Sequence, residues 1–342
     1  MRHINIPIFI PHLGCPNQCI FCNQRYISGT QEFRETDVDK QIKDVLSTVS
    51  VNDKCEIAFF GGSFTGIDRE LMVRLLDKAQ KYVDDGLVES IRMSTRPDYI
   101  TEEIISILKN YTISVVELGI QTMSDDILKL LKRGHTVTDT IKAAELLNSA
   151  DIKFVGQMMI GLPGASLQDE EYCAEQICKL GAVASRIYPT LIFKNTELEN
   201  MTNEGKYKPI GLDEAIERSA RVLDIFEKNN VKCIRIGLCD SDNLHSSDTY
   251  LAGPNSPSIG EMVKSRLFYN VVCEQLYKQG LKGKELYIYC PLGKRSQVIG
   301  HRRINIKNLI NNFSFERIIV IENEHLENYD IILKEKEEKP CV

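Results

Sequence analysis

Short apolar runs alternate with amphipathic stretches along the first 240 residues of the chain. The runs are rich in Ile, Val and Phe and have the length of strands. Between them, apolar residues recur at helical spacing, as Val38, Ile42 and Val45 do. The pattern predicts strands at 4–10, 56–60, 90–94, 113–119, 153–160, 185–193 and 232–237. Helices are predicted near 36–49, 68–79, 101–109, 138–148, 167–180 and 212–229, with Thr36 and Asp68 as N-caps of the first two.

A strand and a helix that repeat at this spacing require right-handed crossovers and therefore a parallel sheet. Six or seven such units are fewer than the eight of a closed barrel. The sequence thus predicts an α/β fold, a partial (β/α)6-type TIM barrel over residues 1–240, with a doubly wound open sheet as the alternative. After residue 240 a Gly/Pro/Ser-rich loop precedes a predicted helix at 259–279. Residues 241–342 are therefore expected to add this helix and a small α/β appendage.

Composition narrows the class of protein. With 43% apolar and 26% charged residues, the chain of 342 residues is globular. Its net charge of −6 gives no overall reason to bind nucleic acid or an anionic membrane, although a local basic face still could. The apolar runs are too short to cross a membrane, and Asn5 and Pro7 break the first one, which is expected to be a strand and not a signal peptide. We therefore expect a cytoplasmic protein, in which eleven cysteines do not form a disulfide scaffold.

Polar or glycine-rich segments lie at the ends of the predicted strands. The first strand runs into Cys15, Cys19 and Cys22, in the spacing C-x3-C-x2-C. Because the carboxyl ends of parallel strands meet at one end of a barrel, we expect the strand ends to surround one site. The next four predicted strands end in GGSFTG (61–66), STRPD (94–98), ELGIQT (117–122) and GLPG (161–164). The segment KRGHT (132–136) follows ELGIQT further along the chain.

Three thiolates within eight residues suit a soft metal, which means zinc or an iron–sulfur cluster. Structural zinc needs a fourth ligand, and His12 is the candidate for a Cys3His site. A [4Fe–4S] cluster held by three cysteines instead leaves one iron open to a substrate or cofactor, and the spacing favours this interpretation. The other cysteines are scattered, and we expect them to act as small buried hydrophobes.

The cysteine spacing, together with the pair Gly61 and Gly62 after the second strand, resembles the radical S-adenosylmethionine superfamily. With ELGIQT, RGHTVTDTI and GLPG, residues 10–240 are similar to the radical domain of the Elongator catalytic subunit and, more weakly, to oxygen-independent coproporphyrinogen oxidase. The resemblance implies an oxygen-sensitive enzyme with a [4Fe–4S] cluster on Cys15, Cys19 and Cys22. Electrons from a flavodoxin- or ferredoxin-type donor would let it cleave S-adenosylmethionine to a 5′-deoxyadenosyl radical.

That radical would abstract hydrogen from a substrate, which the resemblance suggests is a nucleoside in RNA. Two alternatives stay open at this point. One is a radical enzyme that acts on a small molecule of the tetrapyrrole type. The other is a nucleic-acid-binding protein that holds structural zinc on Cys15, Cys19 and Cys22.

The same resemblance implies which residues contact S-adenosylmethionine. Phe21 is expected beside the adenine, Gln121 at the ribose or the methionine carboxylate, and Arg133 in a bidentate pair with that carboxylate. A tight strand–helix turn is the alternative for the glycine pair, and a solvated helix end is the alternative for Arg133 and His135. The other implied contacts are Gly61, Gly62, Ser63 and Thr65 at the methionine amino group, Ser94 and Thr95 at the ribose, and Gly161 and Gly164 at the adenine edge.

The residues after 240 depart from the Elongator subunit, because they do not resemble its acetyltransferase domain. Only the machinery that starts radical chemistry is therefore expected to carry over, and not the modification of the tRNA wobble uridine. This region also contains the basic segment 281–307, in which Lys294–Lys307 form a loop ahead of a predicted helix. Such a loop predicts an RNA or phosphorylated partner, with a solvated basic surface as the alternative.

Overall fold

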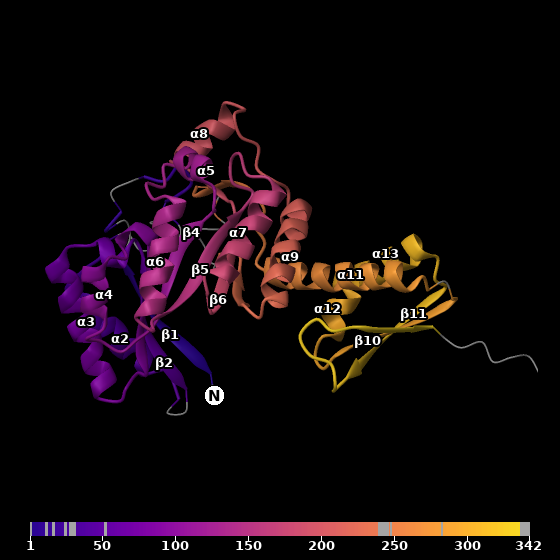
Figure 1. Ribbon diagram of the computed structural model, residues 1–342, viewed down its shortest axis with the longest axis horizontal. Helices are drawn as coiled ribbons and strands as arrows, with labels where there is room; N and C mark the ends of the chain where they lie inside the picture. Colours follow the sequence, from indigo (N-terminus) through magenta and orange to yellow (C-terminus); the bar gives the residue numbers. More distant parts are fainter. Residues whose placement is uncertain are drawn as a thin grey trace, which may run out of the picture.

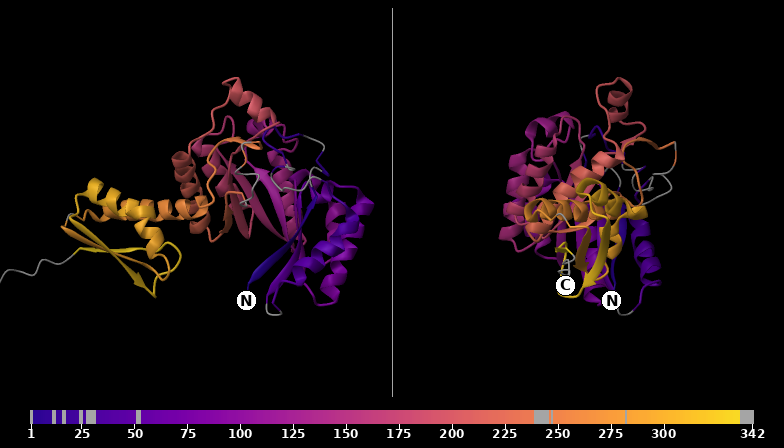
Figure 2. Two further views of the ribbon diagram at one scale, coloured as in Figure 1. Left: turned by 180° about the vertical axis from the view of Figure 1, so that it is seen from behind. Right: turned by 90° about the vertical axis from the view of Figure 1, so that its right-hand side faces the viewer.

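Seven parallel strands form a curled sheet in the computed structural model, which describes residues 2–10, 13–15, 18–23, 26, 32–50, 53–238, 246, 248–281 and 283–335. The spatial order of the strands follows the chain and never reverses, which excludes the doubly wound alternative. The sheet curls into the predicted half-barrel (Figure 1 and Figure 2). In order, the strands are β1 (His3–Ile10), β2 (Lys54–Gly61), β3 (Ser90–Thr95), β4 (Ile113–Gln121), β5 (Lys153–Ile160), β6 (Ala184–Pro189) and β8 (Lys232–Ile236).

The two faces of the sheet have different neighbours, as β1 illustrates. Ile6, Ile8 and Ile10 are buried in the main hydrophobic core, which the outer helices complete. The alternate residues Asn5 and Phe9 line a cavity on the inner face. This alternation follows from the two-residue period of a strand. The core therefore lies between sheet and helices, and the concave side is left for function.

Helices follow the strands of the half-barrel and cover its outer face (Figure 1). Their starts are set by short polar side chains. Asp68 caps α3 as predicted, because its carboxylate accepts the Leu71 N–H at 2.9 Å. Thr36 is not the predicted cap: α2 begins at Val38, and the Thr36 hydroxyl donates to Asp37 at 3.3 Å instead. The helices are α2 (Val38–Leu46), α3 (Arg69–Asp84), α4 (Glu102–Leu108), α5 (Asp125–Leu130), α6 (Val137–Ser149), α7 (Leu167–Lys179), α8 (Glu197–Asn203) and α9 (Leu212–Lys228), with 3-10 turns η1 (Glu35–Asp37), η2 (Phe64–Gly66) and η3 (Pro97–Tyr99).

The predicted strand 185–193 is in fact two strands. β6 ends at Pro189, although the N–H and the hydroxyl of Thr190 still donate to the carbonyl of Ile160, at 2.9 and 2.8 Å. The following β7 (Ile192–Phe193) pairs antiparallel with β9 (Tyr250–Ala252) in a small separate sheet. Proline cannot donate to the next residue pair of a ladder, which explains the break.

The C-terminal appendage has its own hydrophobic core. It contains β10 (Glu285–Pro291), parallel to β11 (Arg317–Asn323) and antiparallel to β12 (Ile332–Glu335), with α12 (Arg295–Ile299), η4 (His301–Arg303) and α13 (Ile304–Phe313). Strand β12 was not predicted from the sequence. The long helix α11 (Ile259–Gln279) joins the two cores, because Val263 packs in the barrel core and Val272 in that of the appendage. The boundary near residue 240 stays a prediction. None of the helices in the described part of the chain could span a bilayer.

Candidate active site

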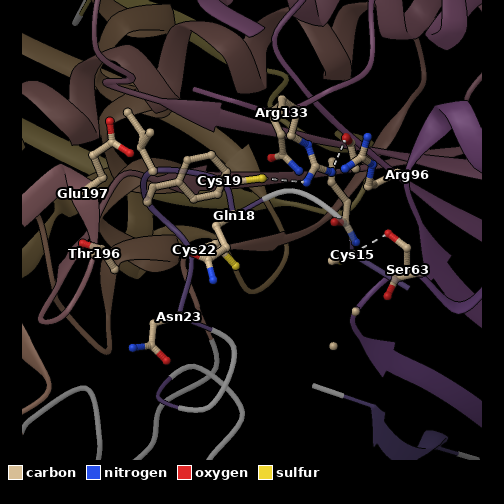
Figure 3. A pocket seen from close by; sticks show the side chains of 18 of the residues that line it. Cys15, Gln18, Cys19, Cys22, Asn23, Ser63, Arg96, Arg133, Thr196 and Glu197 are labelled. Atoms are coloured by element: carbon tan, nitrogen blue, oxygen red, sulfur yellow. Dashed lines mark hydrogen bonds between the residues drawn. The ribbon is translucent and has the colours of Figure 1, made fainter. Parts of the chain in front are cut away.

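A cavity of about 680 Å³ lies at the carboxyl ends of the barrel strands. It is bounded by the loop that follows β1 and by the ends of β2, β3 and β4, together with the turn after α5 (Figure 3). Segments that are far apart in the sequence thus meet at one site, as the motif positions predicted. The predicted site residues that line it are Cys15, Cys19, Phe21, Cys22, Gly61, Gly62, Ser63, Ser94, Thr95, Gln121 and Arg133.

The loop with the three cysteines is seated on the glycine-rich segment after β2, backbone against backbone. A Cβ atom added to Gly62 would lie 2.1 Å from the carbonyl oxygen of Leu13. Conversely, a Cβ added to Gly14 would lie 2.2 Å from the carbonyl oxygen of Ser63, and Gly14 has a φ of +70°. Only residues without Cβ allow two backbones to approach this closely. The glycine pair therefore has a structural reason for its position, independent of any ligand.

The far end of the same loop is also anchored. The N–H of Ile20 donates to the carbonyl of Leu131 at 3.2 Å, and the carbonyl of Ile20 accepts the N–H of Leu198 at 2.8 Å. The Ile20 side chain is 1% exposed, in a small cluster with Leu162 and Leu198. These contacts hold the cysteine loop against α5 and α8, so that its thiols face the cavity.

Two of the three thiols, those of Cys15 and Cys19, lie beside described polar groups. The Cys15 sulfur lies 3.6 Å from the Ser63 hydroxyl, and the Cys19 sulfur accepts a hydrogen bond from Arg133 at 3.5 Å (Figure 3). Within the described residues, no three His, Cys, Asp or Glu side chains are close enough together to hold one metal ion. A single zinc needs its sulfurs about 2.3 Å from one point. His12, the proposed fourth zinc ligand, lies outside the described residues.

A [4Fe–4S] cluster places different demands on the same loop. Each cysteine binds its own iron, so the three sulfurs do not converge on one atom. Three soft thiols, a buried cation beside one of them and a cavity of about 680 Å³ fit this group.

Two strand ends shape the cavity through unusual backbone or buried polar contacts. Gln121 has a φ of +69°, and the register of β4 against β5 shifts between Gly119 and Gln121. Such a bulge re-aims a side chain, here into the cavity. Thr65 does not line the cavity but supports it, because its hydroxyl lies 2.7 Å from that of Thr95 and donates to the carbonyl of Tyr99 at 3.0 Å.

Arg133 and His135 lie at the end of α5 and are buried, at 9% and 3% exposure, so the solvated helix end is wrong. The N–H of Arg133 closes the helix on the carbonyl of Leu128 at 3.0 Å, and Gly134 supplies a φ of +82°. Burial, with the nearby charges of Arg133 and Arg96, lowers the pKa of His135 to about 3. His135 is therefore neutral at physiological pH.

Arg96 is the main cavity residue that the sequence analysis missed. It follows β3 in the STRPD segment, is 2% exposed, and forms two hydrogen bonds to the Asp98 carboxylate, at 2.9 and 2.7 Å. Its guanidinium also lies 5.4 Å from the centre of the Tyr99 ring. The Asp two residues after the arginine was the available signal. Other lining residues without a prediction are Gln18, Ile20, Asn23, Tyr26, Gly119, Gln157, Asn195, Thr196 and Glu197.

Gly161 and Gly164 do not line this cavity. The Gly161 N–H donates to the Glu170 carboxylate at 2.7 Å, and its carbonyl accepts the Tyr207 hydroxyl at 2.6 Å. Glu170 is 2% exposed, and burial raises its pKa to about 7 although Arg218 lies 3.2 Å away. These hydrogen bonds hold the backbone of the GLPG turn in place. A contact of this turn with adenine stays a prediction.

A second cavity, of about 900 Å³, runs along the inner face of the half-barrel. It is lined by the inward side chains of the strands, many of them aromatic or aliphatic, including Phe9, Phe60 and Tyr188. The two cavities adjoin each other, because both are lined by Phe21, Cys22, Gly61, Ser94, Gln121 and Gln157. We call the second one the lumen.

A buried ionic network lies in the lumen. Glu117 is 1% exposed, and its carboxylate accepts hydrogen bonds from Arg92 at 2.6 Å, Arg186 at 2.8 Å and Gln157 at 2.7 Å. Arg92 also pairs with Glu56 at 3.1 Å. Two carboxylates thus balance two guanidiniums, which fixes these side chains in place. The sequence analysis did not identify this network.

Of the remaining described cysteines, Cys55, Cys173 and Cys290 are buried as predicted, whereas Cys178, Cys233 and Cys273 are half-buried. Cys173 is 1% exposed, and burial raises the pKa of the Cys178 and Cys233 thiols to about 11. Thiols of this kind stay protonated and are poor metal ligands. Cys239 and Cys341 lie outside the described residues.

The comparison with known families agrees with the chemistry that the residues of the site indicate. The Radical SAM superfamily matches residues 9–176, and the Radical_SAM C-terminal domain matches residues 183–268. The chain belongs to the radical S-adenosylmethionine superfamily. It is a radical S-adenosylmethionine enzyme, and members of this superfamily use a [4Fe–4S] cluster and S-adenosylmethionine.

Its relatives include tRNA-modifying enzymes and Elongator proteins, which confirms the resemblance. The tRNA uridine(34) acetyltransferase of Methanocaldococcus infernus is 34% identical over 185 residues, or 48% of this chain and 35% of that protein. Elongator complex protein 3 of Saccharomyces cerevisiae is 28% identical over 193 residues, or 50% and 34%. An uncharacterized protein of Methanocaldococcus jannaschii is 32% identical over 217 residues, or 60% and 66%.

The fold of this radical S-adenosylmethionine enzyme is also found in a solved relative. The archaeal Methanocaldococcus infernus Elp3, with an N-terminal deletion, superposes with a TM-score of 0.61 at 24% identity, over 82% of this chain and 64% of that one. In sequence, the match covers about a third of the length of the two tRNA uridine(34) acetyltransferases at the head of the comparison. The superposition therefore supports the half-barrel architecture, and the activity of those longer proteins is not transferred.

Proposed function

We propose that Cys15, Cys19 and Cys22 of this enzyme hold a [4Fe–4S] cluster and that S-adenosylmethionine binds beside it in the 680 Å³ cavity. One observation carries the proposal: the three thiols and the ends of β2, β3 and β4 line a single cavity (Figure 3). When bound, the cluster and S-adenosylmethionine supply a reducing electron and a 5′-deoxyadenosyl radical for hydrogen abstraction. The protein contributes the seating of the loop and the buried cations.

The residues around the cavity suit the groups of S-adenosylmethionine. Ser63, Ser94 and Thr95 offer hydroxyls, and the re-aimed Gln121 offers an amide, which match the amino, ribose and carboxylate groups. Phe21 offers an aromatic face for the adenine, as inferred from the resemblance. Of the two cations, Arg96 is already paired with Asp98. Arg133 therefore remains the better partner for a carboxylate.

The substrate is proposed to enter the lumen, which adjoins the cavity through shared lining residues. Its aromatic lining, with Phe9, Phe60 and Tyr188, suits a planar base. An RNA nucleoside is supported by the tRNA-related names of the relatives. A small tetrapyrrole-type molecule is the competing substrate that the assay below separates.

RNA would be held outside the lumen by the basic segment Lys294–Lys307. The sequence predicted a loop here, but the segment folds as α12, η4 and the start of α13. Lys294 interacts electrostatically with Glu227 and Glu261. Among the described residues, no carboxylate forms an ion pair with Arg302, Arg303 or Lys307, so these three charges remain for a phosphate. Figure 1 shows the appendage beside the barrel and away from the end that carries α5 and α8. An RNA that uses both surfaces must therefore extend along the side of the barrel.

Anaerobic reconstitution tests the cluster. The wild-type protein should bind about four iron and four sulfide per chain and show a broad absorption that Cys15→Ala, Cys19→Ala and Cys22→Ala abolish. Cys173→Ala is the matched control, because that thiol is buried in the barrel core, away from the cavity. A colourless protein with one zinc per chain would refute the proposal in favour of a structural metal.

Reduction with dithionite in the presence of S-adenosylmethionine tests the reaction. 5′-Deoxyadenosine should form, and total tRNA should raise its yield if the substrate is RNA. Charge reversal at Arg302 and Arg303 should weaken RNA binding and reduce its salt dependence. Reversal at two exposed lysines of the barrel, Lys109 at the end of α4 and Lys142 on α6, is the control with the same change in net charge. Stimulation by a tetrapyrrole and not by tRNA would remove the RNA assignment.

A further inference from the structure

Arg133 carries a buried positive charge that no carboxylate in the described part of the chain balances. The residue is 9% exposed, and its Nε is buried without a hydrogen-bond partner among the described residues. Nη2 donates to the carbonyl of Gly119 at 2.9 Å, and Nη1 donates to the sulfur of Cys19 at 3.5 Å (Figure 3). A buried cation that only neutral groups contact is costly. The position therefore calls for an anion, and the Cys19 sulfur is the neighbour that becomes anionic when it binds a metal.

Arg96, the second guanidinium of the cavity, differs in this respect. Its two hydrogen bonds to Asp98 make a pair with no net charge. The charge of Arg96 also reaches Cys19, but the Asp98 carboxylate offsets part of its field there. Arg133 is thus the uncompensated cation of the site.

The position of the Arg133 guanidinium depends on a glycine in ELGIQT. A Cβ added to Gly119 would lie 2.6 Å from Nη2 of Arg133 and 3.0 Å from the amide nitrogen of Gln121. Gly119 has no positive φ, so an added Cβ would act only by displacing the ends of these two side chains. The sequence thus reserves room for this guanidinium beside Cys19.

We infer that Arg133 sets the reduction potential of the metal centre on the cysteine loop, an inference that rests on the proposed function. A cation that donates a hydrogen bond to a ligating sulfur favours the state with more negative charge. When an external donor adds one electron, the guanidinium stabilises the added charge through Cys19. Arg133 is then a positioning residue for electron entry, and this role does not require S-adenosylmethionine to be present.

An anaerobic redox titration followed by electron paramagnetic resonance, without S-adenosylmethionine, tests the inference. In Arg133→Met, the ratio of reduced to oxidised centre at a fixed potential should fall about tenfold, which corresponds to a midpoint about 59 mV lower. Arg133→Lys keeps the charge but loses the forked donor, so its shift should be smaller. Gly119→Ala keeps every charge and displaces the guanidinium, so it should shift the midpoint in the same direction.

The double variant Arg96→Met/Asp98→Asn is the matched control, because it removes a buried guanidinium without changing the net charge. Its midpoint should stay near that of the wild type. If Arg133→Met loses iron, Arg133→Lys and Gly119→Ala carry the comparison. A wild-type midpoint in the Arg133 variants, with only weaker S-adenosylmethionine binding, would show that Arg133 serves the ligand alone and would overturn the inference. An equal shift in the control would overturn it too, whereas a wild-type protein without a cluster would refute the proposed function itself.

Discussion

Replacing Gly62 by alanine should uncouple the cysteine loop from the barrel. The new Cβ would lie 2.1 Å from the carbonyl oxygen of Leu13 and 2.9 Å from that of Ile10, where ordinary contact begins at 3.4 Å. Gly62 needs no positive φ, so the conflict is purely steric. Both neighbouring atoms belong to the backbone, and neither can rotate away. Something larger than a side chain must therefore move.

Two responses compete, and their costs can be compared. If the loop stays in place, the overpacking costs about 1–3 kcal/mol or more. If the loop lifts, it breaks the hydrogen bonds from the Gly62 N–H to Ile10, at 2.8 Å, and from the Ser63 N–H to Leu13, at 3.2 Å. Each is worth about 0.5–1.5 kcal/mol, so lifting costs about 1–3 kcal/mol and relieves the whole overlap. We expect lifting, with a modest loss of stability and a large loss of metal.

Two measurements on the same variant check this expectation. Iron per chain after anaerobic reconstitution should fall well below the wild-type value, while the free energy of unfolding in urea should fall by only about 1–3 kcal/mol. Gly211→Ala is the control, because a Cβ there meets nothing within 4 Å and φ is −73°. Full iron binding and wild-type stability in Gly62→Ala would refute the idea that backbone contact seats the loop.

Three further predictions concern buried polar groups. Glu117→Gln should lower the free energy of unfolding, measured in urea, by about 3–5 kcal/mol, because Arg186 and Arg92 then share one carboxylate. Glu145→Gln, on the exposed face of α6, should change it little. Burial raises the pKa of Glu170 from 4.5 to about 7, so between these pH values the folded state keeps a proton that the unfolded chain releases. The free energy of unfolding of the wild type should therefore fall from pH 4.5 to pH 7, and Glu170→Gln should make this fall less steep. An equally steep fall in the variant would contradict the assignment. Gln121→Ala should keep the iron but weaken S-adenosylmethionine binding in calorimetry, and wild-type affinity would exclude Gln121 as a contact.

The parts of this fold that follow local rules could be read from the sequence. The strands of the half-barrel are apolar runs, because each packs one face on the helices, and Asp68 was recognisable as a cap from its position. The cysteines and the glycine pair were recognisable because their spacing is unusual. Thr36 failed as a cap because a single 3-10 turn precedes α2, and side-chain geometry at that scale is not visible in a residue pattern.

The ionic network was out of reach for a different reason. Arg92, Glu117 and Arg186 belong to β3, β4 and β6, and β6 is not a neighbour of β4 in the sheet. The pairing of Glu117 with Arg186 across β5 depends on the curl of the sheet, which a sequence of βα units does not specify. Arg96 was predictable in part, because Asp98 indicates a local ion pair but not that Arg96 lines the cavity.

The geometry of the site depends on three glycines, which leave room for close contacts. Gly14 and Gly62 let the cysteine loop and the glycine-rich segment touch, and Gly119 leaves room for the guanidinium that contacts Cys19. The cysteine loop and the glycine-rich segment should therefore move together. A change that lifts the loop also moves Ser63, a proposed contact of S-adenosylmethionine. It follows that variants at Gly62 should lose iron and ligand binding together, whereas variants at Gln121, on a separate strand, should lose ligand binding alone. If Gly62→Ala lost only one of the two, the coupling between the motifs would be disproved.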